Sequence, residues 1–260
     1  MRTSKTGKQF QIKDRDYVAA LAAGLAVMEA FGPKDPRLTL SDVARKADLT
    51  RAAARRHLLT LVELGYAESD GKFFSLTARV LRLGHEHVTA APLPKLAQPI
   101  LQMIGDKTGH VASLAVLDES DSVFLARSVS NRIVSLAIGV GTRLPAYCTS
   151  TGRVVLAGRS DAEVERFLAG IRPMKYTHKT KSGHQLMEEI RKARSNGFAI
   201  SDEEYEIGLR SIAVPVRNAS GETVAAISFS VHAERMTPKQ MTKELLPPLE
   251  VGRQMLSAML

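Results

Sequence analysis

Residues 50–59, TRAAARRHLL, bring together three arginines, a histidine and three alanines without any acidic residue. Arginine binds guanine O6 and N7 through two hydrogen bonds, or it pairs with a phosphate. Small side chains let a helix backbone approach base edges, and alanine methyls can contact thymine methyls. A charge run alone is more often a solvated surface. The segment therefore predicts a DNA-reading helix only if its neighbours position it for that role.

The residues before this segment predict two helices. Residues 16–31 show helical spacing of apolar side chains, which predicts a helix with one buried stripe. The GPKDP stretch at 32–36 ends that helix. Ser41 is the expected N-cap of a short helix over 42–47. The expected stripe of the first helix consists of Val18, Leu21, Leu25, Met28 and Phe31.

The residues after Leu49 predict a third helix and a hairpin. Thr50 is the expected N-cap of a helix that runs to about Leu64, and Gly65 is its expected left-handed stop. Residues 66–76, YAESDGKFFSL, read as two short strands around an Asp-Gly turn. Two helices, a turn, a third helix and a hairpin predict a winged helix-turn-helix over residues 16–76. This context favours DNA contact by the 50–64 helix over a solvated face.

Helical periodicity divides the third helix into a core face and a solvent face. At about 100° per residue, the expected core face is Ala54, Leu58, Leu61 and Val62. The opposite face is small and basic, and the hairpin tip adds a lysine for a flanking phosphate or the minor groove. The residues predicted to contact DNA are Thr50, Arg51, Ala52, Ala53, Arg55, Arg56, Thr60 and Lys72.

A second segment with chemical potential is CTSTGRVVLAG at 148–158. Hydroxyl residues precede an apolar helical run, and a helix N-terminus presents unpaired N–H groups with partial positive charge. Ser150 and Thr151 add hydroxyl donors, so the segment is a reasonable cradle for a small organic acid. From the residues alone, an ordinary N-cap on a core helix is the commoner explanation.

Cys148 raises the alternative of an enzyme. A thiol nucleophile would need a base, and His110, His178, His184 and His232 are the candidates. The sequence has no G-x-S-x-G, P-loop or HExxH pattern, and its histidines lack metal-ligand spacing. A free cysteine is more often a small core residue than a catalyst. We therefore expect no enzyme, no metal and no cofactor.

The remainder of the chain predicts a larger α+β unit. Residues 77–92 are expected to form a linker helix, and residues 93–260 a sheet with helices on its sides. The predicted strands are 110–118, 122–130, 131–139, 209–218 and 223–231. The predicted helices are 95–109, 150–158, 162–170, 183–198 with a stop at Gly197, and 237–260 interrupted at Pro247 and Pro248.

Composition limits the class of protein. The chain has 260 residues, is 44% hydrophobic and carries a formal net charge of +9, which favours contact with polyanions. One cysteine excludes an internal disulfide and fits a reducing cytoplasm. No apolar run reaches the roughly 18 residues of a membrane span, so we expect no membrane partner. Residues 1–15 are expected to form a basic arm without the apolar core of a signal peptide.

Four stretches resemble the IclR family of bacterial transcriptional regulators. They are LSDVARKADLTRAAARRHLLTLVELGYAE, LPAYCTSTGRVVLAG, GFAISDEEYEIGLRSIAVPV and GETVAAISFSV. The wording around GTRLPAYCTSTGRVVLA is most similar to the branch that regulates aromatic-acid catabolism, with effectors such as protocatechuate, 4-hydroxybenzoate and β-ketoadipate. The family often has Ser/Thr and Val where this chain has Ala52, Ala53 and Ala54. That departure leaves open which bases are read.

The resemblance implies a GAF-like C-terminal domain with a pocket for an aromatic or dicarboxylic acid. The acids of SDEEYE, including Asp202, are expected at the pocket rim or on the surface, because lining acids would repel an anion. The implied partners are an operator duplex, the effector, further copies of the chain in a dimer or tetramer, and RNA polymerase. An effector-independent nucleic-acid binder is the alternative, but only 5% of the residues are aromatic, which argues against base-stacking platforms. The implied effector-binding residues are Leu136, Leu144, Tyr147, Thr149, Ser150, Thr151, Leu209, Ser211, Ser228 and Ser230.

Overall fold

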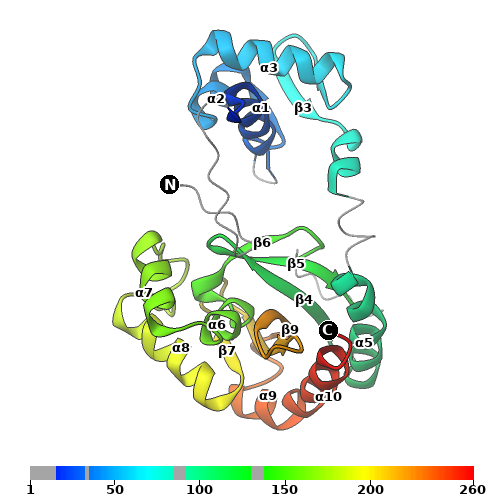
Figure 1. Ribbon diagram of the computed structural model, residues 1–260, viewed down its shortest axis with the longest axis vertical. Helices are drawn as coiled ribbons and strands as arrows, with labels where there is room; N and C mark the ends of the chain where they lie inside the picture. The colour runs from blue at the N-terminus through cyan, green and yellow to red at the C-terminus, as the bar shows by residue number, and fades with distance from the viewer. Residues whose placement is uncertain (1–15, 33–34, 85–91, 130–137) are drawn as a thin grey trace. The chain divides into compact units, whose positions relative to one another are not determined.

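The computed structural model describes residues 16–32, 35–84, 92–129 and 138–260. The chain divides into two compact units, 1–87 and 88–260, which are treated separately below (Figure 1). The expected basic arm and Leu136 lie outside the described residues. Within the described ranges, no helix is both long enough and apolar enough to span a bilayer.

The N-terminal unit is a winged helix-turn-helix, as predicted. Its helices are α1 (Ala19–Glu29), α2 (Leu40–Lys46) and α3 (Arg51–Glu63). The wing hairpin consists of β2 (Ala67–Ser69) and β3 (Phe73–Leu76). A strand that the sequence did not predict, β1 (Arg37–Thr39), pairs antiparallel with β3 and gives the order β1-β3-β2. The wing is therefore anchored on both sides of its central strand.

The N-cap of α2 is Thr39, and the prediction of Ser41 was wrong. The Thr39 hydroxyl accepts a hydrogen bond from the backbone N–H of Asp42, and the Asp42 carboxylate accepts from the backbone N–H of Thr39. This reciprocal capping box explains why the helix begins two residues earlier. The hydrogen bonds that the Asp42 carboxylate accepts from Thr39 and from Arg45 lower its pKa.

The buried stripe predicted for the first helix was also wrong in part. Val18, Leu21 and Leu25 are 62%, 64% and 48% exposed, whereas Val27 is completely buried. The sequence of α1, AALAAGLAVME, is apolar around most of its circumference. Spacing alone therefore did not select the face that packs on the rest of the unit.

The predicted linker helix falls partly outside the described residues. A 3₁₀ turn, η2 (Ala78–Val80), continues as helix to residue 84, and residues 85–91 are not described. Pro92, expected to close the linker, instead begins α5 (Pro92–Thr108). Proline suits the first turn of a helix because that turn has no intrahelical acceptor for its N–H groups.

The C-terminal unit is built on a six-stranded antiparallel sheet with the order β6-β5-β4-β9-β8-β7. The predicted hairpin of β8 and β9 forms. Two short edge strands, β6 and β7, were not predicted, and the strand predicted over 131–139 lies mostly outside the described residues. The strands are β4 (Val111–Asp118), β5 (Asp121–Arg127), β6 (Arg143–Pro145), β7 (Ala199–Asp202), β8 (Leu209–Arg217) and β9 (Thr223–His232).

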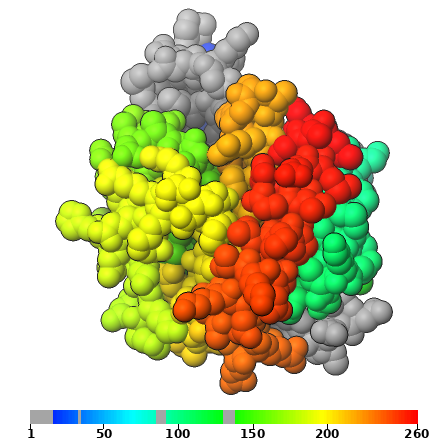
Figure 2. Space-filling model, turned by 90° about the horizontal axis from the view of Figure 1, so that it is seen from below, coloured from blue at the N-terminus to red at the C-terminus, as the bar shows by residue number. Residues whose placement is uncertain are grey.

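Helices cover both faces of this sheet, which confirms the predicted α+β class (Figure 1). One face packs on α5, α9 (Pro238–Glu244) and α10 (Leu246–Ser257), and Figure 2 shows α10 lying beside α5. The other face packs on α6 (Ser150–Ala157) and α8 (His184–Asn196), with α7 (Asp161–Gly170) contributing Val164 and Phe167 to the same core. As predicted, α8 stops at the left-handed Gly197, and the helix break falls just before Pro247 and Pro248.

Candidate functional site

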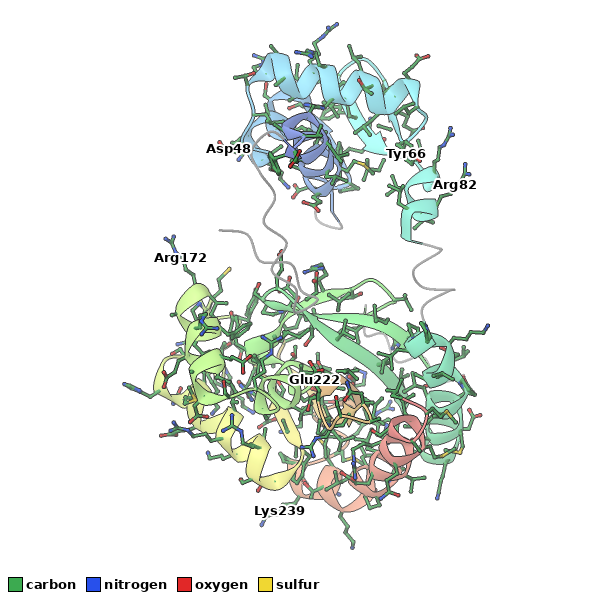
Figure 3. The ribbon with its side chains drawn as sticks, viewed as in Figure 1. Asp48, Tyr66, Arg82, Arg172, Glu222 and Lys239 are labelled. Atoms are coloured by element: carbon green, nitrogen blue, oxygen red, sulfur yellow. The ribbon has the colours of Figure 1, made fainter. Side chains whose placement is uncertain are left out.

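The turn before α3 and its cap set the position of the basic helix. Asp48 adopts a left-handed conformation at φ 53° between α2 and α3 (labelled in Figure 3). Thr50 is the N-cap, as predicted, and its hydroxyl accepts from the N–H of Ala53 at 3.2 Å. Ala54, Leu58 and Leu61 are buried on the core face as predicted, and Val62 is half-buried. This packing turns the alanine- and arginine-rich surface outward.

The arginines of that surface are exposed and unpaired. Arg51, Arg55 and Arg56 form no ion pair with any acid of the described chain, whereas Arg45 on α2 pairs with Asp42 at 2.9 Å. The Thr60 hydroxyl donates to the carbonyl of its own helix at Arg56 (2.9 Å). Guanidinium groups without acidic partners are free to contact phosphates or guanine. The geometry thus suits the predicted role of α3.

Two further cations, one on β1 and one on the wing hairpin, lie over one aromatic ring of the wing. The Lys72 ammonium and the Arg37 guanidinium each lie 5.2 Å from the centroid of Phe73. Arg37 also pairs with Asp70. Backbone N–H groups of Phe73 and Lys72 donate to the Asp70 carboxylate, which lowers its pKa and fixes the turn. Lys72 itself stays exposed and has no acidic partner among the described residues.

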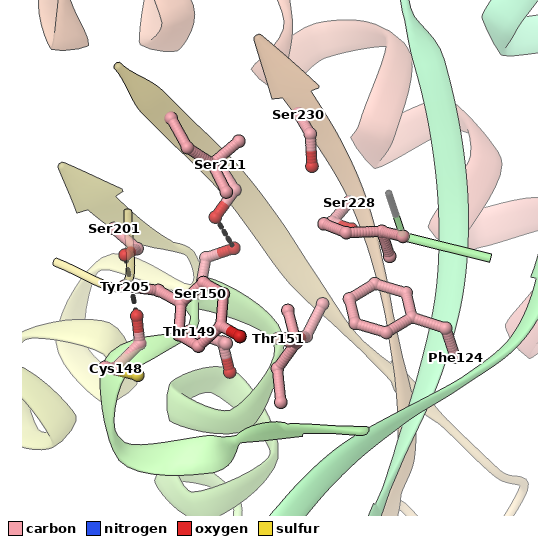
Figure 4. A pocket seen from close by; sticks show the side chains of 13 residues that line it. Phe124, Cys148, Thr149, Ser150, Thr151, Ser201, Tyr205, Ser211, Ser228 and Ser230 are labelled. Atoms are coloured by element: carbon pink, nitrogen blue, oxygen red, sulfur yellow. Dashed lines mark hydrogen bonds between the residues drawn. The ribbon is translucent and has the colours of Figure 1, made fainter. Parts of the chain in front are cut away.

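The C-terminal unit contains a cavity between the start of α6 and the face of β8 and β9 (Figure 4). It holds about 380 Å³ of empty space, part of it open to solvent. Eight of the predicted effector residues meet there, and no charged side chain is among the described residues that line it. These eight are Leu144, Thr149, Ser150, Thr151, Leu209, Ser211, Ser228 and Ser230; the other lining residues are Phe124, Ile138, Cys148, Ser201 and Tyr205.

Some hydroxyls of the cavity are already committed to partners within the protein. Ser150 donates to the Ser211 hydroxyl at 2.8 Å, and Ser201 donates to the carbonyl of Cys148 at 2.8 Å (Figure 4). Thr149 caps α6 by accepting from the N–H of Gly152, and Thr151 donates to Ser122 at 3.0 Å. These bonds hold the first turn of α6 against the sheet.

Other hydroxyls are uncommitted. Among the residues that the structure describes, the side chains of Ser228, Ser230 and Tyr205 have no hydrogen-bonding partner. Ser228 is 2% exposed and lines the cavity, which is where the family resemblance implied that it would lie. Uncommitted donors in a largely apolar cavity are the usual means of orienting a small ligand.

Tyr147 does not line the cavity, which corrects the expectation for that residue. Its hydroxyl donates to the carbonyl of Met174 at 2.9 Å and accepts from the N–H of the same residue at 2.8 Å. Burial raises the pKa of Tyr147 to about 12. Both hydrogen-bonding capacities of the phenol are used to hold residue 174. The phenol in the cavity wall is Tyr205 instead.

Arg153 and Glu204 form a buried ion pair that the sequence did not predict. Their side chains are 1% and 3% exposed, and Arg153 Nη1 lies 2.7 Å from Glu204 Oε1 while Nη2 bonds Oε2. Glu204 was expected with its neighbours at the rim or on the surface, and the structure corrects this. Asp202 and Glu203 do not line the cavity either, and both pair with Lys179 and Arg210.

The cysteine of the enzyme alternative is a buried thiol. Cys148 is completely buried, and its Sγ donates to the carbonyl of Pro145 at 3.4 Å. Burial raises the pKa of the Cys148 thiol to about 12, so the reactive thiolate is scarce at neutral pH. Among the described residues, no histidine lines the cavity, and no cluster of three metal-ligating side chains occurs.

A winged helix-turn-helix followed along the chain by a unit with a hydroxyl-lined cavity is the arrangement of a DNA-binding regulator with an effector-binding domain. Two family models agree with this class. The IclR helix-turn-helix domain matches residues 20–71, and the bacterial transcriptional regulator IclR C-terminal domain matches residues 85–257. The chain therefore belongs to the IclR family of transcriptional regulators.

Individual relatives place the chain more narrowly. The Pca regulon regulatory protein of Pseudomonas putida is 40% identical over 91% of this chain and 82% of its own length. The p-hydroxybenzoate hydroxylase transcriptional activator of Acinetobacter baylyi is 39% identical over 92% and 90%. A solved complex of a PobR inducer-binding-domain double mutant with 3-hydroxybenzoic acid, from Acinetobacter, is 32% identical with a TM-score of 0.62, covering 65% of this chain and all of that one. The predicted likeness to the aromatic-acid branch is confirmed.

Proposed function

We propose that this regulator responds to a small monocyclic aromatic acid that occupies the cavity between α6 and the sheet. The observation that carries the proposal is the chemistry of the cavity wall, in which hydroxyls and apolar side chains converge and no described lining residue carries a charge. A relative that activates transcription of p-hydroxybenzoate hydroxylase, and one solved with bound 3-hydroxybenzoic acid, support the same ligand class.

The start of α6 is the expected position of the carboxylate. The first N–H groups of any α-helix lack intrahelical acceptors and carry partial positive charge. Ser150 and Thr151 stand at this turn and line the cavity. Anions bind at such helix starts without a cationic side chain. The absence of lining lysine or arginine in the described cavity is therefore compatible with an anionic effector.

The apolar part of the wall favours an aromatic ring over an aliphatic dicarboxylic acid. Phe124, Ile138, Leu144 and Leu209 line the cavity. A second carboxylate placed among these side chains would lose its hydration without a cation to replace it. An aromatic ring loses little hydration free energy there and gains packing contacts.

Effector binding acts on DNA through a difference in affinity between two states of the protein. The proposed arrangement is a dimer, or a pair of dimers, with each α3 in a major groove of a palindromic operator. The effector binds one arrangement of the DNA-binding units more tightly and so changes operator affinity or recruitment of RNA polymerase.

Replacing Ser228 with alanine tests the cavity. Its hydroxyl has no partner within the described chain, so its removal costs little stability but removes one bond to a ligand. We expect 4-hydroxybenzoate to bind at least about 5-fold more weakly, because a hydrogen bond contributes roughly 1 kcal/mol. Isothermal titration calorimetry measures the affinity, and thermal unfolding of both proteins checks stability.

The matched control for this variant is Ser113→Ala. Ser113 lies directly opposite Ser228 in the β4–β9 register and is also buried, but it does not line the cavity. It should bind the acid like the wild type. Equal affinity of the wild type and Ser228→Ala would contradict the proposed position of the ligand. If no aromatic acid binds or stabilises the wild type, the effector-independent alternative is favoured instead.

Replacing Arg56 with alanine tests the DNA-reading surface. The Arg56 guanidinium is exposed on α3 without an acidic partner in the described chain. We expect a loss of about 1–3 kcal/mol in binding to a selected operator, roughly 5- to 150-fold, if this side chain bonds guanine. Electrophoretic mobility shifts on a duplex enriched from a random library by the full chain provide the measurement.

Arg235→Ala is the charge-matched control for Arg56→Ala. Arg235 is an exposed arginine of the C-terminal unit, so its replacement lowers the net charge equally. It should leave operator affinity nearly unchanged. A similar loss in both variants would show that α3 contributes only general charge, and no loss in Arg56→Ala would remove this side chain from the interface.

A further inference from the structure

We propose that Tyr205 is the specificity-determining residue of the cavity, and that its phenol hydroxyl recognises a hydroxyl group on the ring of the effector. This inference rests on the proposed aromatic-acid function. It adds to that function a reason why a hydroxylated acid is preferred to the acid without the hydroxyl.

The Tyr205 side chain is held in the cavity wall by a second aromatic ring. The centroids of Tyr205 and Tyr176 are 5.0 Å apart with an interplanar angle of 46°. Figure 4 shows the Tyr205 ring beside the start of α6 among the hydroxyl residues of the cavity. A tyrosine loses little conformational entropy when it is held this way, because it has only two side-chain torsions.

The backbone immediately before Tyr205 is also fixed. The Thr177 hydroxyl donates to the carbonyl of Glu203 at 2.7 Å, and the Thr180 hydroxyl donates to the carbonyl of Glu204 at 2.6 Å. The Glu204 side chain is held by the buried Arg153. Three independent interactions thus position Glu203 and Glu204, the two residues that precede Tyr205. A recognition group on a rigid support keeps its geometry before the ligand arrives.

The hydroxyl of Tyr205 is the part of this residue that stays uncommitted. Within the described chain it has no hydrogen-bonding partner, in contrast to Tyr147, which bonds Met174 twice. Burial raises the pKa of Tyr205, so the phenol keeps its proton at neutral pH. A neutral phenol both donates and accepts, which complements a ring hydroxyl that does the same.

A partner of this kind gives strong discrimination. A site that hydrogen-bonds a ligand hydroxyl rejects the analogue without it, because its own polar group is then left buried and unpaired. An apolar wall at the same position would accept both ligands. We therefore expect the wild type to bind a hydroxybenzoate at least about 10-fold more tightly than benzoate.

The test is Tyr205→Phe, which removes one oxygen and keeps the ring. Calorimetric titration of wild type and variant with benzoate, 3-hydroxybenzoate and 4-hydroxybenzoate gives the affinity ratios. Expected is a loss of about 10-fold for the preferred hydroxybenzoate and no loss for benzoate. A ratio that stays unchanged, or an equal loss for benzoate and hydroxybenzoates, overturns the proposal, because Tyr205 would then be inert or act on the carboxylate.

A second variant tests the positioning by Tyr176. Tyr176→Ala removes the ring that packs on Tyr205, so discrimination should fall in the wild-type background and stay unchanged in the Tyr205→Phe background. Equal effects in both backgrounds would overturn the positioning role. If the wild type binds none of the three acids, the proposed effector class itself is wrong. If it binds benzoate and hydroxybenzoates equally, only the inference about Tyr205 fails.

Discussion

Replacing Arg153 with alanine should destabilise the effector-binding domain by about 3–5 kcal/mol, because it leaves the Glu204 carboxylate buried without its partner. Both side chains are almost completely buried and are joined through two nitrogens and two oxygens. Urea unfolding of the full chain, followed by circular dichroism, measures the loss. The transition of the C-terminal unit should move to lower urea.

Two further variants test whether the loss of stability comes from the buried charge of Glu204. Arg143→Ala breaks exposed pairs with Asp118 and Asp121 at 2.8 and 3.2 Å and should cost less than about 1 kcal/mol. The double variant Arg153→Met with Glu204→Leu should recover much of the stability, since apolar residues of similar volume tolerate burial. If Arg153→Ala lowered the free energy of unfolding no more than Arg143→Ala does, the prediction would be wrong, because Glu204 would not be left buried and charged at a cost in stability.

Replacing Gly152 with alanine should destabilise the same domain by about 1–3 kcal/mol or more and weaken effector binding. A Cβ at this position would lie 2.2 Å from the Ala146 oxygen and 2.4 Å from its Cα, both backbone atoms. The start of α6 would have to move away from the preceding 3₁₀ turn, η3 (Ala146–Cys148), and carry Ser150 and Thr151 with it.

The control for Gly152→Ala is Gly170→Ala at the end of α7. A Cβ there meets no atom within 4 Å, so alanine should be neutral or stabilise by up to about 1 kcal/mol. Thermal unfolding and titration with 4-hydroxybenzoate compare the two variants. Wild-type affinity in Gly152→Ala would mean that the helix start tolerates the displacement.

Local sequence signals predicted the DNA-binding unit well where they had a single interpretation. The cap at Thr50, the stop at Gly65 and the period of α3 all specify the same helix, and the structure agrees. Thr39 and Ser41 are both good caps, and only the reciprocal bond with Asp42 decides between them. The helix α1 is apolar on nearly all sides, so tertiary packing selected its buried face.

The cavity was predictable mainly through the family resemblance, which implied the hydroxyls at the start of α6 and the serines of β9 as two of its walls. From the residues alone, an N-cap and a solvent-facing strand were also open explanations. Phe124 lies on β5 and Tyr205 in a loop, and they reach the cavity through strand order and loop path, which spacing does not encode. Tyr147 and Tyr205 are indistinguishable by residue type. Arg153 carried a weak signal, since a lone arginine inside an apolar helix requires a buried partner.

Side chains along β9 alternate between the cavity and the core of the effector-binding unit, so this strand connects the two. Ser228 and Ser230 line the cavity, while Ile227 and Phe229 pack in the core shared with α5 and α10. A Cβ on Gly252 of α10 would lie within 3.4 Å of Ile227, Ile104 and Ile100, so the side chains on this face of the strand are closely packed. Close-packed interiors are nearly incompressible. Any sliding of β9 that accommodates a ligand must therefore push on α5, the first described helix of the C-terminal unit.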